Sequence, residues 1–414
     1  MVTSKPTKQL SLAGAVAIGM ASMLGAGVFF VWSSAWQIAG EKIFIALLLA
    51  GLVACLNAAS VYQLASNISR AGGVYAYSRV YLPTGFSFIA GFAFVFGKIA
   101  SIAAISLIIQ TYLLPGSYIA SIAVLVLTAL NLLGINRTAQ MAAVIATATT
   151  AFLIFSIIAG FSNGFNPSEF RVNMLWPSRD ISILSAAALI FFAFAGYARV
   201  ATLGDEVRDP KKNIPKAIVI SLSAVLGLYL LIAVVVVGVI NTGNEPMPEA
   251  VFEYLLFVSA PWFSPVIIDA VVVAASLGSM LALLAGVSRT AATMAEDKEL
   301  PSVFAKRNRF GAPWLAEALI AVGAVILIES REYTYWVIAF SSFSVLLYYA
   351  IGHLSVLAQP KDQRRQPRFI AILGFLLCAL LLVSVPGPAV LISTVILVVA
   401  YGARAALRAL AKAK

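Results

Sequence analysis

Apolar residues fill this chain in runs of about twenty, and short polar stretches separate one run from the next. An α-helix needs about twenty apolar residues to cross the hydrocarbon core of a bilayer. A window of that length predicts twelve helices, at 12–38, 43–67, 85–113, 117–134, 139–161, 182–203, 214–240, 262–294, 314–329, 333–357, 368–386 and 388–409. The pattern therefore predicts an all-α polytopic membrane protein.

The composition points the same way. Of 414 residues, 61% are hydrophobic and 11% are charged, whereas soluble domains have roughly 45–50% and about 25%. No aqueous core can bury so much apolar surface, which excludes a set of soluble domains and a disordered chain. The first run is too long for the core of a cleavable signal peptide. No linker or low-complexity segment interrupts the chain, so residues 1–414 are expected to form a single transmembrane domain.

The net charge of +11 is explained by the topology of the chain. With both termini placed in the cytoplasm, most of the 28 Lys and Arg residues fall on the inner face, and few fall on the outer face, such as Lys42, Arg171, Arg179 and Arg331. This distribution satisfies the positive-inside rule for an even number of crossings. We therefore expect a multi-pass protein of the plasma or inner membrane, with the bilayer as its partner and no nucleic acid.

Residue types needed for several kinds of chemistry are scarce. The chain has one histidine, and its two cysteines, Cys55 and Cys378, lie within apolar runs. A disulfide framework or a multi-histidine metal site is therefore not expected. The sequence also lacks the Gly-Lys-Ser/Thr loop that cradles nucleotide phosphates. Neither an enzyme nor a bound cofactor or metal is predicted.

Two of the predicted helices contain residues that weaken a helix near its middle. In the first, Gly19 precedes the segment 22–29, Ser-Met-Leu-Gly-Ala-Gly-Val-Phe; in the sixth, aromatic residues gather around Gly196 in the segment 191–197. Gly costs about 1 kcal/mol relative to Ala inside a helix. Gly also serves close helix packing in membranes, so spacing alone leaves unwinding and packing equally open for each helix.

The positions of the two segments correspond if the chain repeats itself. Residues 11–161 and 182–358 would then form a five-plus-five inverted repeat, and 368–409 would add two further helices. Broken helices at matching positions of two halves are the best sequence pointer to a transporter's substrate site. Unwound backbone offers N–H groups to an anion and carbonyls to a cation, and a free amino acid carries both charges.

Four stretches together resemble the amino acid–polyamine–organocation (APC) permease superfamily. They are the glycine-rich segment 19–29; Arg70-Ala-Gly-Gly-Val-Tyr-Ala-Tyr-Ser-Arg79; the acidic, Pro-containing and basic loop 204–218; and Ser288-Arg289 with the segment 294–301. They lie within residues 11–315, and beyond that point the likeness is one of hydropathy only. The resemblance implies a LeuT-type fold that holds its substrate between broken helices 1 and 6.

The resemblance also implies residues for the substrate site. The backbone of Gly25, Ala26 and Gly27 would bind a carboxylate, and carbonyls around Ala21, Ser22, Phe191 and Phe194 would take an amine. Phe192, four residues before Gly196, lies where an aromatic gate is often found. Two departures concern the coupling ion: Ala198 replaces a frequent acidic residue, and Thr149 or Thr150 replaces a lysine that some proton-coupled relatives carry in helix 5.

Two charged residues lie inside predicted helices. Lys98 is near the middle of the third, where a cation costs at least about 2.5–3.5 kcal/mol and usually faces the bundle interior. It is expected to act in proton coupling or in a structural ion pair, and Asp269 in the eighth helix is a candidate partner or a residue of the outer interface. Ser276 and Ser279 can offer hydroxyls to an ion or serve helix packing. His353 is expected at the inner interface.

An inner gate is a further expectation from the resemblance. It would consist of Arg70 and Arg79 in the first inner loop and of Asp205 and Glu206 after the sixth helix. The alternative for the acidic pair is a solvated helix end beside the turn at Asp209-Pro210.

The function implied is secondary active transport of amino acids by alternating access, coupled to protons or to exchange. Because the residues around the breaks are Ala, Gly, Ser, Met and Phe, a neutral, apolar amino acid is the expected substrate. A cationic amino acid or polyamine antiporter is the alternative, since aromatic faces also bind cations. Broken helices also line pores, so an ion channel remains open, as does a sensor that binds amino acid without moving it.

Overall fold

The computed structural model describes residues 10–413 except 26, 69, 71, 134–137, 171–180, 198–199, 201–202, 204–206, 241–246 and 331–333. Described helices lie within each of the twelve predicted ranges. They are α1 (Leu12–Met23), α2 (Gly27–Ala39), α3 (Ile43–Asn67), α4 (Val74–Tyr81), α5 (Thr84–Leu113), α6 (Ile119–Leu132), α7 (Thr138–Ser162), α8 (Ser182–Phe194), α10 (Pro210–Val239), α11 (Val251–Ser259), α12 (Pro265–Glu296), α13 (Trp314–Glu329), α14 (Thr334–Ala358), α15 (Arg368–Ser384) and α16 (Gly387–Ala413).

The prediction of an all-α polytopic membrane protein is confirmed. Among the described residues, seven helical segments are long and apolar enough to cross a membrane, and three shorter apolar helices accompany them. Many large apolar side chains are exposed along these helices, for example on α16 at Val395, Val398 and Val399. An exposed apolar surface of this extent suits lipid as its solvent.

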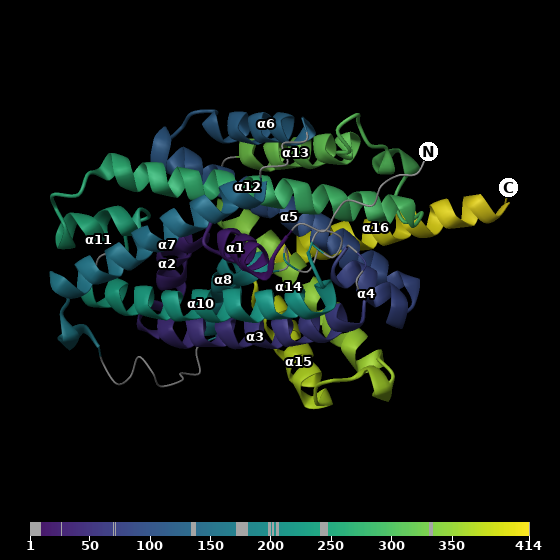
Figure 1. Ribbon diagram of the computed structural model, residues 1–414, viewed down its shortest axis with the longest axis horizontal. Helices are drawn as coiled ribbons and strands as arrows, with labels where there is room; N and C mark the ends of the chain where they lie inside the picture. Colours follow the sequence, from purple (N-terminus) through teal and green to yellow (C-terminus); the bar gives the residue numbers. More distant parts are fainter. Residues whose placement is uncertain are drawn as a thin grey trace.

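The long helices run roughly along one direction and form an elongated bundle (Figure 1). Helix α5 packs against both α12 and α14, while α3 packs along α10. The short helices α1, α2 and α8 lie among these long ones, so they are buried in the middle of the bundle. One end of the bundle carries α4 and the other carries α11 (Figure 1), and we name the ends after these two helices.

The Gly-Gly pair of the first loop makes the turn between α3 and α4. Gly72 and Gly73 have φ angles of 115° and 58°, a region that glycine adopts at no steric cost and that other residues rarely enter. The turn brings α4 back across the bundle end, where the Val74 N–H donates to the Tyr348 hydroxyl of α14 at 2.8 Å. The Gly72-Gly73 pair is therefore needed to make the turn between α3 and α4.

The expectation that His353 lies at an interface is wrong. His353 is fully buried between α3 and α15. Its Nδ1 lies 2.7 Å from Ser60 Oγ, and its Nε2 lies 2.7 Å from Asn57 Oδ1, which also accepts from the Cys378 thiol at 3.1 Å. A buried imidazole is tolerated because both ring nitrogens find partners, and these partners lie almost three hundred residues away in the sequence.

Candidate functional site

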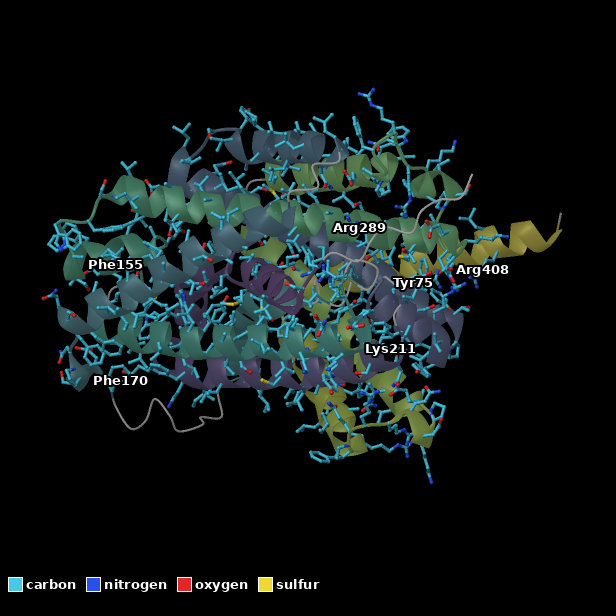
Figure 2. All side chains as sticks on the ribbon, viewed as in Figure 1. Tyr75, Phe155, Phe170, Lys211, Arg289 and Arg408 are labelled. Carbon is cyan, nitrogen blue, oxygen red and sulfur yellow. The ribbon has the colours of Figure 1, made fainter. Side chains whose placement is uncertain are left out.

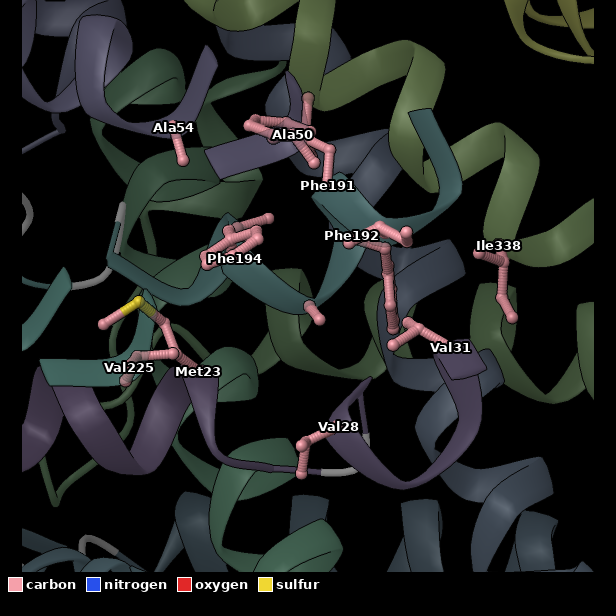
Figure 3. Close-up of a cluster of buried hydrophobic side chains, with 14 of the residues drawn as sticks. Met23, Val28, Val31, Ala50, Ala54, Phe191, Phe192, Phe194, Val225 and Ile338 are labelled. Atoms are coloured by element: carbon pink, nitrogen blue, oxygen red, sulfur yellow. The ribbon is translucent and has the colours of Figure 1, made fainter. Parts of the chain in front are cut away.

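The first predicted helix is interrupted at its glycine-rich segment. Helix α1 ends at Met23, and α2 begins at Gly27. The last regular bond runs from the Leu24 N–H to the Met20 carbonyl at 2.7 Å, and only a long contact of 3.4 Å joins the Val28 N–H to the Gly25 carbonyl. Figure 3 shows Met23 and Val28 on either side of the interruption. The structure therefore has unwinding here, and Ala26 lies outside the described residues.

The sixth predicted helix changes its winding at the corresponding place. Helix α8 ends at Phe194, and residues Ala195–Tyr197 form a single tighter turn of 3₁₀-helix. Such turns leave carbonyls of the preceding helix without their usual partners. Both glycine- and aromatic-rich segments therefore expose backbone groups in the middle of the bundle.

The two interruptions touch each other through their backbones. A Cβ at Gly196 would overlap the carbonyl of Ser22 and the amide of Met23, and a Cβ at Gly27 would come within 3.0 Å of the Ala193 Cα. A Cβ at Gly25 would overlap the Ser279 Cβ on α12. Glycine at these positions permits close packing of the two segments on each other and on α12.

A tyrosine hydroxyl spans the two interruptions. Tyr229 of α10 is fully buried, and its hydroxyl donates to the Met23 carbonyl at 2.8 Å and lies 3.3 Å from the Ala193 carbonyl. Sequence reasoning missed this residue. Its one signal is a hydroxyl within an otherwise aliphatic run of α10, which is weak because buried tyrosines are common.

A small cavity lies where the two interruptions meet α5 and α12. Its volume is about 20 Å³, which suffices for a single water molecule and not for an amino acid. The lining is Ser22, Met23, Gly27, Lys98, Ser101, Ile105, Phe192, Ala193, Gly196, Ser279 and Leu283. In this conformation the described residues leave no room there for an amino acid.

Six of the residues singled out from the sequence line this cavity: Ser22, Gly27, Lys98, Phe192, Gly196 and Ser279. Ala21 and Gly25 are their buried neighbours at the end of α1. Phe191 and Phe194 supply backbone at the same level, but their rings pack elsewhere, against Tyr349 and Tyr229. Figure 3 shows these aromatic side chains leaving α8 in different directions.

Lys98 brings a charged group into the cavity. Its side chain is buried, with 3% of its surface exposed, and its Nζ donates to the Ala195 carbonyl at 3.4 Å. Within the part of the chain that the structure describes, no carboxylate lies within 4.0 Å of this amine. Ser101, one turn further along α5, shares a hydrogen bond of 2.7 Å with Ser341 of α14.

The other coupling candidates do not all gather here. Ser276 is buried on α12, and its hydroxyl has no partner among the described residues. Thr149 is buried in α7 and absent from the cavity lining, while the Thr150 hydroxyl donates to the Ala146 carbonyl. Asp269 lies near the start of α12, ten residues before Ser279, and is absent from the cavity lining.

Arg70 and Arg79 of the proposed inner gate make ion pairs with residues that follow α12. Arg70 lies 2.8 Å from Asp297, and Arg79 lies 2.9 Å from Glu299. The Tyr75 hydroxyl also donates to Asp297 at 2.9 Å. Asp205 and Glu206 lie outside the described residues, so the acidic partners seen in the structure are not those that the sequence suggested.

Helix α16 joins this cluster. The Glu299 side chain is fully enclosed, and Arg404 and Arg408 of α16 reach it at 2.6 Å and 2.7 Å. Burial alone raises the pKa of the Glu299 carboxyl, but hydrogen bonds from Arg404 and Arg79 and the charges of Arg404 and Arg408 outweigh it and leave that pKa below its usual range. Figure 2 shows Tyr75 and Arg408 at the same end of the bundle.

Comparison with known proteins identifies a family and several similar chains. The family model described as "Amino acid permease" matches residues 14–411. An uncharacterized transporter of Mycobacterium tuberculosis is 38% identical over 96% of this chain and 91% of its own length. Cationic amino acid transporter 3, mitochondrial, of Arabidopsis thaliana is 27% identical over 73% of this chain and 54% of its own length.

A third relative widens the range of substrates among similar proteins. The methylthioribose transporter of Bacillus subtilis is 27% identical over 74% of this chain and 72% of its own length. The motifs, the paired helix interruptions and the match over nearly the whole chain agree on one conclusion. This chain is a membrane protein of the amino acid permease family, within the APC superfamily.

Proposed function

We propose that this permease carries amino acids by alternating access, with the substrate bound between the two interrupted helices. The observation that supports this most is the meeting of both interruptions at one small cavity, with Gly196 against the Ser22 backbone. Unwound backbone there supplies N–H groups for a carboxylate and carbonyls for an amine. Enlarging the cavity requires α1 and α8 to separate, and that movement would admit the substrate.

The proposal includes the topology expected from the sequence. Twelve helices cross the plasma or inner membrane, with both termini and the α4 end in the cytoplasm and the α11 end outside. This orientation follows the positive-inside rule, since the arginines of the cluster around Glu299 lie at the α4 end. The two halves, 11–161 and 182–358, form the inverted repeat, and α15 and α16 add to it.

A neutral amino acid fits the cavity better than a cationic one. Among the described residues, its lining carries the cationic Lys98 and no carboxylate. A lysine or arginine side chain there would meet a like charge without a counter-ion, which costs free energy in a low-dielectric site. The relatives named as cationic amino acid transporters favour the alternative of a cationic substrate.

Lys98 is the proposed coupling residue. Its amine contacts the Ala195 carbonyl of the second interruption, so its charge acts directly on backbone that would also face the substrate amine. A buried ammonium without a counter-ion is costly, and a neutral amine is much less so. Gain and loss of one proton at Lys98 would therefore change the balance between the closed and open cavity.

A binding experiment tests substrate class and site together. Each of the twenty amino acids is added to the purified protein in lipid nanodiscs, and the midpoint of thermal unfolding is measured. We expect neutral, apolar amino acids at 100 times their Kd to stabilise the protein by about 2.7 kcal/mol, and Ser279→Leu, which fills the cavity, to abolish the shift. Stabilisation by arginine and lysine alone would overturn the neutral assignment.

The role of Lys98 needs its own comparison. Proton-driven uptake is measured for the wild type, for Lys98→Met and for Lys211→Met, a control at an exposed lysine of α10. We expect gradient-stimulated uptake to be lost only in Lys98→Met, while exchange of internal for external amino acid persists. Uptake in the wild type that ignores the gradient and requires internal amino acid would identify an exchanger and leave Lys98 a structural charge.

A further inference from the structure

The connection between α14 and α15 carries a dense cluster of cations. Residues 361–368 read Lys-Asp-Gln-Arg-Arg-Gln-Pro-Arg, with four cations, one acid and a net charge of +3. Among the described residues, none of these four cations lies within 4.0 Å of a carboxylate. We call residues 359–368 the basic connection, since it presents an excess of positive charge to its surroundings.

Uncharged polar side chains hold the basic connection against α3 and α4. The Gln63 side chain of α3 donates to the Gln359 side chain at 2.6 Å and accepts from the Gln366 N–H at 3.0 Å. The Gln363 side chain accepts from the Tyr81 hydroxyl of α4 at 2.7 Å. The glutamines therefore face the bundle, and the basic connection lies at the α4 end.

The cations of the basic connection lie on its outer side. Lys361, Arg365 and Arg368 are exposed, and Arg364 is half-buried. The guanidinium groups of Arg364 and Arg368 both reach back to the Leu357 carbonyl, at 3.4 Å in each case. Because the glutamines fix the backbone, these positive charges are held in a preorganised arrangement, which lowers the cost of binding a ligand.

The basic connection also has more hydrogen-bond donors than acceptors. The Gln359 side-chain nitrogen and Arg364 Nε are enclosed, and neither has a hydrogen-bond partner in the described part of the chain. Gln359 is fully buried, and buried polar groups without partners are rare. Both atoms are donors, so the basic connection lacks acceptors. A phosphate group brings acceptors only, and arginine binds it through strong, charge-assisted hydrogen bonds.

An apolar surface that suits lipid begins beside these cations. Arg368 is the first residue of α15, and Ile372 and Leu376 follow it at intervals of four residues on the same face of the helix. Ile372 is 46% exposed, Leu376 is 56% exposed and Phe369 is 64% exposed. Figure 1 shows α15 projecting from the side of the bundle next to α3. A phospholipid with its phosphate at Arg368 therefore has an apolar surface for its acyl chains.

We propose that the basic connection and the exposed face of α15 bind an anionic phospholipid of the inner leaflet. Arg365 and Arg368 hold its phosphate, and its acyl chains lie along Ile372 and Leu376. Clusters of Lys and Arg directly beside the cytoplasmic end of a membrane helix attract anionic lipids in this way. The inference rests on the proposed function only for the word inner, and the site is separate from the cavity at the interruptions.

Native mass spectrometry of the whole protein, purified in detergent, tests this proposal. Phosphatidylglycerol and phosphatidylcholine with the same acyl chains are titrated separately, and the Kd of the first bound lipid is measured. Arg365→Gln/Arg368→Gln removes the two arginines that hold the phosphate. Lys211→Gln/Lys212→Gln is the matched control, because it removes two exposed charges from the start of α10. The readout requires no transport, so failure of the proposed function would leave it intact.

A third variant separates loss of charge from misfolding. Arg365→Lys/Arg368→Lys keeps both positive charges, so it should bind phosphatidylglycerol much more tightly than the glutamine variant does. Inorganic phosphate is added to the wild type in a further titration, because a soluble anion shares the chemistry of the lipid phosphate and lacks the acyl chains.

We expect the wild type to bind phosphatidylglycerol at least about tenfold more tightly than phosphatidylcholine. Arg365→Gln/Arg368→Gln should weaken phosphatidylglycerol binding about thirtyfold, since each basic residue near the surface contributes about fivefold. The α10 control should bind like the wild type. Equal binding of the two lipids by the wild type, or equal losses in the two glutamine variants, would overturn the site. So would a lysine variant as weak as the glutamine one. Displacement of the lipid by inorganic phosphate would assign the site to a soluble anion, and the lipid proposal would fail.

Discussion

Single residues decide whether the two interruptions can meet. Gly196 has no side chain, so the two backbones can approach each other there. Tyr229 instead offers its hydroxyl to carbonyls of both segments. Neither role depends on the substrate, so both can be tested through stability as well as transport.

Gly196→Ala should impair transport strongly. The added Cβ would overlap the Ser22 backbone, which cannot yield as a flexible side chain would, so α1 and α8 must move apart. We expect at least a tenfold loss of uptake, equivalent to about 1.4 kcal/mol. Gly227→Ala is the matched control, because its Cβ would meet nothing within 4 Å. Wild-type uptake by Gly196→Ala would contradict the close contact.

Tyr229→Phe should lower the free energy of unfolding by about 1–3 kcal/mol. The substitution keeps the ring and leaves the buried Met23 and Ala193 carbonyls without their donor, and an unsatisfied buried acceptor costs about that much. The measurement is unfolding in mixed micelles. Tyr254→Phe, at an exposed position of α11, should be neutral; equal effects for the two variants would remove any special role from Tyr229.

At the scale of elements, the sequence predicted positions along the chain better than contacts across it. The helix ranges followed from apolar run length alone. Whether 22–29 and 191–197 unwind or merely pack was undecided, because glycine permits both; the structure shows interruption at both places. Lys98 was predicted near the middle of the third helix, but its contact with the Ala195 carbonyl depends on how α5 packs against the second interruption.

Side chains that meet across distant segments were the ones that escaped prediction. The partners of Arg79 were sought in the loop after the sixth helix, and the structure supplies Asp297 and Glu299, more than two hundred residues from Arg79. His353 was misplaced for the same reason, since its hydrogen-bond partners lie on α3. No local pattern carries such information.

The Glu299 cluster should make the protein sensitive to acid. Because the Arg residues hold the pKa of Glu299 below its usual range, the stabilisation is present above the ordinary glutamate pKa and is lost as pH falls through the lowered value. Glu299→Gln leaves Arg404 buried beside a neutral group, which should cost about 3 kcal/mol. Thermal unfolding at several pH values measures both effects, with the exposed Glu296→Gln as the control. A midpoint unchanged by Glu299→Gln would show that the cluster adds no stability.

At the scale of the whole molecule, the two interruptions meet in the middle of the bundle, and the Glu299 cluster holds the α4 end together. The cavity at the interruptions has room for one water, and the cluster ties α4 to α16. A transport cycle would need the middle of the bundle to open.

Counterflow in liposomes tests the central claim most directly. Vesicles loaded with an unlabelled amino acid mixture are diluted into a trace of the labelled mixture, and the label inside is followed for the wild type, Gly196→Ala and Gly227→Ala. We expect transient accumulation of label by the wild type and Gly227→Ala, and at least about a tenfold smaller accumulation by Gly196→Ala. No accumulation of any amino acid by the wild type, or ionic currents far above one substrate per cycle, would contradict it.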